Sequence, residues 1–148
     1  MQYFAMLIFV SLAAALAATM LFKSRRRRFV ERPDLPLDEW RRLYCTASRS
    51  SYFAADVVLE ALSLEIGCKP GQIRPSDRID TELRVPAIGE VSDSFELADE
   101  RLQSLLAAQG YCIDDSRVFD ECVTVSDVIA RLATELEAHG ISSESSQP

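Results

Sequence analysis

The feature that most constrains this chain is an uncharged, apolar run at its start. Residues 1–22 contain no charged side chain, and the run is followed at once by Lys23-Ser24-Arg25-Arg26-Arg27-Arg28. As an α-helix, these residues would span about 33 Å, slightly more than the roughly 30 Å hydrocarbon core of a bilayer. The run therefore predicts a single transmembrane helix over residues 1–22.

A cleaved secretory signal is the alternative, because Ala15-Leu16-Ala17 provides small residues for a cleavage site. Secretory signals carry positive charge before the apolar region, whereas here the cations follow it, which favours an uncleaved anchor. Lys and Arg beside a membrane segment stay on the cytoplasmic side. We therefore expect the N-terminus outside and all residues after Phe22 in the cytoplasm.

Charge divides the rest of the chain into two parts. Residues 23–42 carry eight basic and four acidic side chains, and residues 43–148 carry eight basic and nineteen acidic ones, a net charge of −11. Residues 23–36 read as a basic juxtamembrane linker that is attracted to the headgroups of the lipid bilayer. The acidic remainder would be repelled by nucleic acid, so nucleic acid is excluded as a partner. The same negative charge favours a protein partner with a basic surface.

Four cysteines and one histidine give no recognisable catalytic or metal-binding pattern. Cys45, Cys68, Cys112 and Cys122 form no Cys-x-x-Cys pair, so no zinc, other metal or redox site is predicted. In the cytoplasm they would be thiols, and only an external domain would favour disulfides. His139 precedes Gly140 at a predicted helix end, where a protonated imidazole is favourable. We expect no enzymatic activity, because no set of base, nucleophile and metal is assembled.

Periodic apolar positions predict a small all-α bundle over residues 37–140, followed by a disordered, serine-rich tail over 141–148. We expect helices at residues 37–46, 52–66, 93–109 and 124–139, the last capped by Thr124 with Asp127 three residues later. Trp40 lies on the apolar stripe of the first and is expected in the core. The long loop 72–89 is expected to be pinned by its apolar residues, Ile73, Ile79, Leu83 and Ile88.

Four stretches in this order resemble an acyl carrier protein over residues 54–138. They are residues 57–67, Val57 to the helix-ending Gly67; residues 73–79, Ile73-Arg74-Pro75-Ser76-Asp77-Arg78-Ile79, with Leu83; Ile113-Asp114-Asp115; and Thr124-Val125-Ser126-Asp127-Val128-Ile129. The resemblance implies an acyl-carrier-like helical bundle after the transmembrane helix.

In that family, a serine in an Asp-Ser-Leu motif at the start of the second helix carries 4′-phosphopantetheine. Asp93-Ser94-Phe95 occupies that place, so the resemblance makes Ser94 the candidate attachment residue. Phe95 replaces the leucine, and an alignment on Gly89 would select Ser92 instead. The other interpretation is that Ser92, Asp93 and Ser94 only cap the helix and that the chain binds no cofactor.

Two functions follow as expectations. The first is a membrane-anchored, non-enzymatic, carrier-like interaction module on the cytoplasmic face. The second is a phosphopantetheine-dependent acyl carrier protein that serves a membrane-associated acyl-transfer or lipid-synthesis system.

Overall fold

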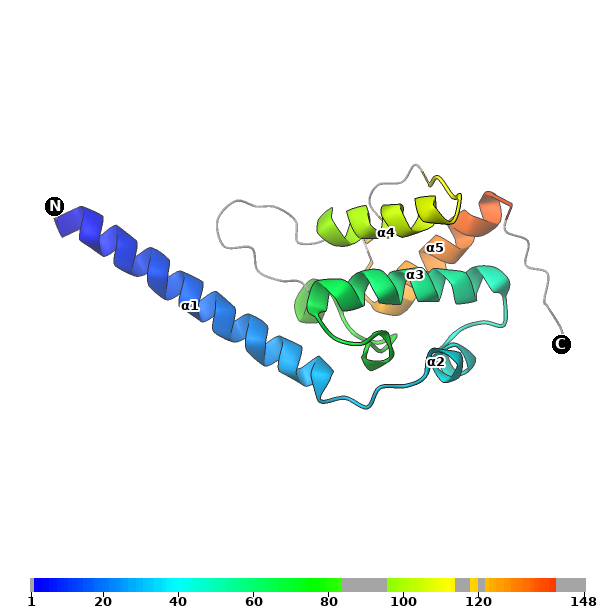
Figure 1. Ribbon diagram of the computed structural model, residues 1–148, viewed down its shortest axis with the longest axis horizontal. Coiled ribbons are helices and arrows are strands. Elements are labelled where there is room, and N and C mark those ends of the chain that lie inside the picture. The colour runs from blue at the N-terminus through cyan, green and yellow to red at the C-terminus, as the bar shows by residue number, and fades with distance from the viewer. Residues whose placement is uncertain (1, 84–95, 114–117, 120–121, 141–148) are drawn as a thin grey trace.

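The computed structural model describes residues 2–83, 96–113, 118–119 and 122–140, and within these ranges it consists of helices and turns without a β-strand (Figure 1). This confirms the all-α prediction. The helices are α1 (Gln2–Val30), α2 (Leu37–Tyr44), α3 (Arg49–Ile66), the 3₁₀ turn η1 (Pro70–Gln72), the π-helical turn η2 (Ile79–Leu83), α4 (Glu96–Ala108) and α5 (Val125–Ala138).

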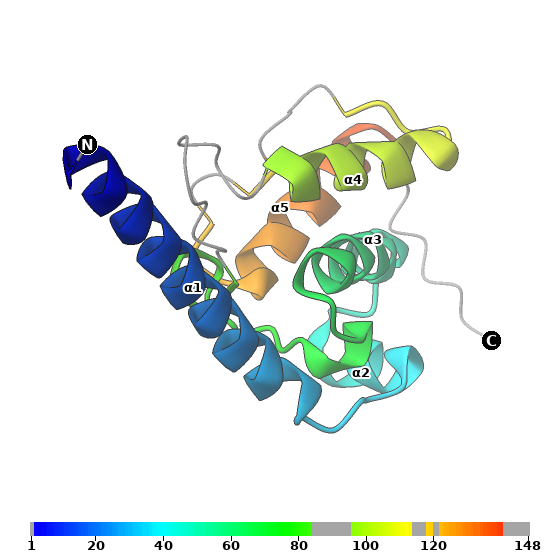
Figure 2. The same cartoon turned by 60° about the vertical axis from the view of Figure 1, so that its left-hand side comes forward.

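Helix α3 is the centre of the bundle. It packs against both α4 and α5, and α2 and η1 lie along its other side (Figures 1 and 2). Ala55 and Leu59 are buried together with Ala54, Val57, Val58, Ala61, Leu62 and Ile66, because neighbours cover α3 on most sides rather than on one face.

The ends of α3 have local causes. The helix starts three residues before the predicted Tyr52, because the Ser48 hydroxyl accepts a hydrogen bond from the Ser51 amide and caps the first turn. It ends at Gly67, whose φ of 70° is the left-handed conformation that suits glycine.

The loop after η1 is fastened to the start of α5. Ile73, Ile79 and Leu83 are buried as predicted, whereas Ile88 lies outside the described residues. The Ile79 amide donates to the carbonyl oxygen of Val123 at 3.0 Å, and the Val125 amide donates to that of Asp77 at 3.1 Å. These bonds place the loop across the N-terminus of α5.

Helices α4 and α5 complete the core. Ala98, Leu102 and Leu106 of α4 are buried, and the predicted N-cap of this helix, Asp93, lies outside the described residues. In α5 the predicted capping box is present: the Thr124 hydroxyl accepts from the Asp127 amide at 3.3 Å, and the Asp127 carboxylate accepts from the Thr124 amide at 2.8 Å.

Helix α1 extends beyond the predicted boundary at Phe22, since residues 23–28 continue it without a break to Val30. Its N-terminal part projects away from the bundle, while its last turns lie against it (Figures 1 and 2). Within the ranges that the structure describes, no helix combines the length and the apolarity that crossing a membrane requires.

Candidate functional site

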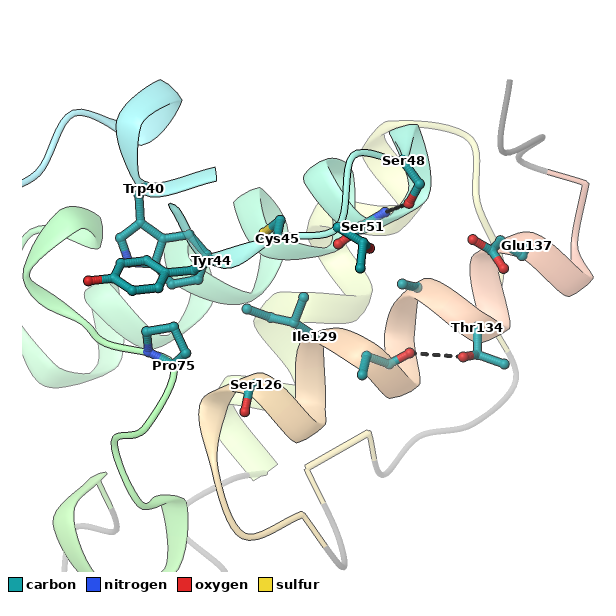
Figure 3. Close-up of a pocket in the computed structure, with 13 residues that line it drawn as sticks. Trp40, Tyr44, Cys45, Ser48, Ser51, Pro75, Ser126, Ile129, Thr134 and Glu137 are labelled. Atoms are coloured by element: carbon teal, nitrogen blue, oxygen red, sulfur yellow. Dashed lines mark hydrogen bonds between the residues drawn. The ribbon is translucent and has the colours of Figure 1, made fainter. Parts of the chain in front are cut away.

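A groove of about 360 Å³ lies between α2, the start of α3 and α5 (Figure 3). We call it the α2–α5 groove. Its lining residues are Trp40, Tyr44, Cys45, Thr46, Ser48, Ser51, Pro75, Ser126, Ile129, Ala130, Ala133, Thr134 and Glu137. Its volume is at the lower end of the range for small-ligand pockets.

One wall of the groove is the outer face of α5. Ser126, Ala130, Ala133 and Glu137 recur at spacings of three or four residues and therefore share one side of the helix. The opposite side of α5 packs into the core through Val128, Leu132 and Leu136. Because most side chains on the outer face are small, another chain could approach the α5 backbone closely.

The facing wall is aromatic and held in place. Trp40 is buried, and its indole N–H donates to the carbonyl oxygen of Ile73 at 2.8 Å. The Tyr44 ring packs edge-on against it with the ring centroids 5.2 Å apart, and 45% of Tyr44 remains exposed. Trp40 is therefore part of the core, as predicted, while Tyr44 offers an accessible apolar edge.

The far end of the groove is polar. The hydroxyl of Ser50, which is fully buried, donates to the exposed Glu137 carboxylate at 2.5 Å and lies 3.1 Å from the Ser48 hydroxyl (Figure 3 labels Ser48 and Glu137). Nearby, burial raises the pKa of the Cys45 thiol, so Cys45 is a neutral thiol at pH 7. The groove therefore offers an apolar edge, a row of small residues and one oriented negative charge.

A second functional feature is the junction between α1 and the bundle. Phe29 of α1 is 3% exposed in the core, and Arg26 Nε donates to the carbonyl oxygen of Gly67 at 3.1 Å. The guanidinium of Arg32 lies 4.7 Å from the centre of the Phe29 ring and makes a two-oxygen ion pair with the buried Asp77 carboxylate at 2.6 and 2.7 Å.

The strap (residues 31–36) after α1 lies on η1 rather than hanging free. Gln72 Nε2 donates to the carbonyl oxygens of Val30 and Arg32 at 2.9 and 3.1 Å, and the Leu35 amide donates to that of Gly71 at 3.2 Å. A Cβ atom at Gly71 would lie 2.0 Å from the Leu35 carbonyl oxygen, so the approach requires glycine. These contacts join residues about 40 positions apart and leave no periodic signal in the sequence.

The cysteines and the acidic residues form no metal centre among the residues that the structure describes. No disulfide joins the four cysteines, of which Cys112 is exposed and the other three are half-buried. Burial raises the pKa of Cys68 to about 11. Among the residues that the structure describes, no three His, Cys, Asp or Glu side chains are grouped so that they could hold a metal ion.

The predicted attachment residue Ser94 and its alternative Ser92 lie outside the described residues, so the structure does not place either one. The groove was not predicted from the sequence, in which Trp40 and Cys45 stood out only as single residues. The spacing of small residues on α5, three or four positions apart, is the signal that could have indicated it. Comparisons of the chain with protein-family models, with curated proteins and with solved structures found no match.

Proposed function

We propose that this protein is a single-pass, membrane-anchored interaction module, with the uncharged residues 1–22 as the anchor and the helical bundle on the cytoplasmic face. No helix qualifies as a membrane span within the described residues alone, so the anchor is proposed from the uncharged run of the full sequence together with the exposure of α1. The observation that carries this proposal is the exposure of α1. Met6, Leu7, Ile8, Phe9 and Val10 are consecutive, so they cover every side of the helix, and they are 57% to 75% exposed. A helix that is apolar all round suits a lipid environment rather than water.

The position of the cations supports the orientation. Lys23 and the arginines after it follow the apolar run directly, on the side where α1 joins the bundle. The bundle has its own core, to which Phe29 is the contribution of α1 among the described residues. The apolar part of α1 is therefore available to lipid without any cost to the packing of the bundle.

Extraction from membranes tests the anchor. The full chain should sediment with membranes and resist alkaline carbonate, and the double variant Leu12→Asp/Leu16→Asp should release it, because each charge at the bilayer centre costs about 3 kcal/mol. The matched control Leu43→Asp/Val123→Asp places the same charges on exposed apolar residues outside α1 and should stay in the membrane. Carbonate-soluble full-length chain would contradict the anchor.

The exposed thiol of Cys112 tests the orientation. A membrane-impermeant maleimide should label it in permeabilised cells and leave it unlabelled in intact cells. Labelling in intact cells would place the bundle on the outside.

The module acts, in this proposal, by binding a basic helical segment of a protein partner in the α2–α5 groove. The row of small residues on α5 suits close helix packing, and Tyr44 provides an apolar contact. Glu137 is oriented by Ser50 and would pair with a Lys or Arg, in keeping with the net charge of −11 over residues 43–148. No reaction is part of this proposal.

A variant with a blocked groove tests whether the partner segment binds in the α2–α5 groove. The probe is a 14-residue amphipathic helical peptide with lysines at one end. Ala130→Trp should fill the groove and reduce peptide binding at least tenfold, while Ala107→Trp on the exposed surface of α4 should not. Binding should weaken several-fold between 50 and 300 mM salt as charges are screened. Binding that is insensitive both to Ala130→Trp and to salt would rule the groove out.

The second candidate is the acyl carrier. What supports it is the order of elements in the bundle, a long helix, a pinned loop, another long helix and a final helix. In addition, α4 begins at the end of the bundle where α3 ends, on the side from which α1 extends (Figures 1 and 2). A group carried at the start of α4 would thus be near the membrane.

Intact mass decides this second candidate. After co-expression with a phosphopantetheinyl transferase, a carrier gains the mass of 4′-phosphopantetheine, and Ser94→Ala should abolish the gain. A gain that survives Ser94→Ala and disappears in Ser92→Ala transfers the site to Ser92. Unchanged mass excludes the carrier and leaves the interaction module.

A further inference from the structure

The junction fixes the direction of the bundle relative to α1. Arg26 bonds to the C-cap of α3, Phe29 is buried, and Arg32 is paired with Asp77 beyond η1. These contacts join the end of α1 and the strap to three separate parts of the bundle. They restrict how the bundle can turn relative to α1 at a membrane surface, whereas a domain on a flexible linker would turn freely.

The end of the bundle beside α1 carries a particular set of exposed side chains. Lys23, Arg27 and Arg28 are exposed on α1, and Lys69 follows the C-cap of α3. Arg27 pairs with Glu31 at 2.6 Å and Lys69 pairs with Asp34 at 3.0 Å, so both cations are exposed but paired. Leu64, one turn before that cap, is 58% exposed although it is apolar. We call these five residues the junction face.

The α2–α5 groove runs from Pro75 and Ser126, close to the Asp77 that pairs with Arg32, to its far end at Ser48, Ser51 and Glu137. Ser48 and Ser51 at the start of α3 line it, whereas Gly67 at the end of α3 contacts Arg26. The 18 residues of α3 separate the two ends by about 27 Å. Figure 1 shows α2 and the start of α3 at the end away from the projecting part of α1.

We propose that the junction face rests on the headgroup layer of an anionic membrane and that the far end of the groove, at Ser48 and Glu137, consequently points into the aqueous phase. This inference rests on the proposed anchoring by α1. The cations of the junction face are attracted to anionic headgroups, and each cation raises the population of the membrane-bound orientation by about fivefold. Leu64 lies where the headgroups meet the protein. The acidic remainder of the bundle is repelled, which favours the same orientation.

Fluorescence quenching in nanodiscs tests this orientation with the full chain. In a background of Cys45→Ala, Cys68→Ala, Cys112→Ser and Cys122→Ala, a fluorophore is attached at Leu64→Cys or at Thr134→Cys in the groove. Lipids with spin-labelled headgroups should quench the label at position 64 at least threefold more than the label at position 134. Equal quenching at the two positions would overturn the inference.

Surface charge variants test the cause without disturbing the core. Arg28→Glu/Lys69→Glu should reduce the quenching at position 64 in discs with phosphatidylglycerol, whereas the control Arg42→Glu/Arg49→Glu, which makes the same charge change near the groove, should not. Quenching at position 64 that is unchanged by Arg28→Glu/Lys69→Glu counts against the cationic contact. If the chain elutes separately from the discs, the anchor itself fails, and that outcome is distinct from equal quenching in discs that contain the chain.

Discussion

At the scale of single residues, Asp77 holds three parts of the chain together. Its carboxylate pairs with Arg32 of the strap and accepts from the Arg74 amide at 2.7 Å, and its backbone carbonyl accepts from Val125 at the start of α5. The side chain is 4% exposed, so the charge is well separated from water. Asp77 was expected in the loop, but this role was not predictable from the sequence, because Arg32 is 45 residues away.

Asp77→Ala should lower the free energy of unfolding by about 2–4 kcal/mol, because it leaves Arg32 without its partner in a partly buried place. Asp77→Asn should cost less, since the amide oxygen can still accept one hydrogen bond. Urea unfolding monitored by circular dichroism measures both. Asp38→Ala removes the exposed pair with Arg41 and should change stability by less than about 0.5 kcal/mol. Equal effects of Asp77→Ala and Asp38→Ala would refute the role of Asp77.

Trp40→Phe should destabilise the bundle by about 2 kcal/mol. The phenyl ring is smaller and leaves the carbonyl oxygen of Ile73 without its buried donor. Tyr44→Phe keeps the ring and alters only an accessible edge, so thermal unfolding of this control should match the unsubstituted chain. The burial of Trp40 was predictable from its apolar stripe, whereas its contact with Ile73 was not.

At the scale of elements, α5 was the most predictable part, because its cap is built from adjacent residues. Hydrogen bonds from the hydroxyl and the amide of Thr124 lower the pKa of Asp127 below its ordinary value of 3.8. The limits of α1 were less predictable: charge marks where an apolar run ends, but arginines are good helix formers and continue the helix. The start of α3 was predicted three residues too late, because the serines at its first turn are equally common in loops between helices.

Asp127→Asn tests the cap through pH. A lowered pKa in the folded state means that the carboxylate contributes stability above about pH 4, and that this contribution is lost as the pH falls through the folded pKa. We expect the variant to be less stable by up to about 1 kcal/mol at pH 7, a small value because the group is exposed. The difference should shrink below pH 4. A difference that is constant from pH 3 to 7 would contradict the role of the charge.

At the scale of the whole molecule, α1, the strap and the bundle are joined at the junction, and we propose different roles for the two ends of the bundle. The sequence was sufficient for the fold class and for the apolar and acidic parts. It was insufficient for the groove, because a groove depends on how α2 and α5 face each other across α3. The strap was expected to be a linker, since prolines and mixed charges in residues 29–36 give no sign of the distant partners Gln72 and Asp77.

Truncation separates the two uses of α1. A variant that lacks residues 1–22 should fold with the stability of the full bundle and appear in the soluble fraction. A variant that lacks residues 1–32 also loses Phe29 and Arg32, and its melting temperature should fall by at least 5 °C, since a buried aromatic ring and an ion pair are worth several kcal/mol. Equal melting temperatures would show that the junction does not stabilise the bundle.

The pairing of Arg32 with Asp77 sets an order of events during synthesis. Phe29 and Arg32 are synthesised, and emerge from the ribosome, before the partners at Gly71, Gln72 and Asp77 have left the exit tunnel. The side chains at the end of α1 are thus exposed while translation continues, and they are covered only when the later residues fold over them. Ribosomes paused at residue 77, when residues 71–77 are still inside the exit tunnel, should accordingly display Phe29 to chaperones, and ribosomes paused after residue 140 should not.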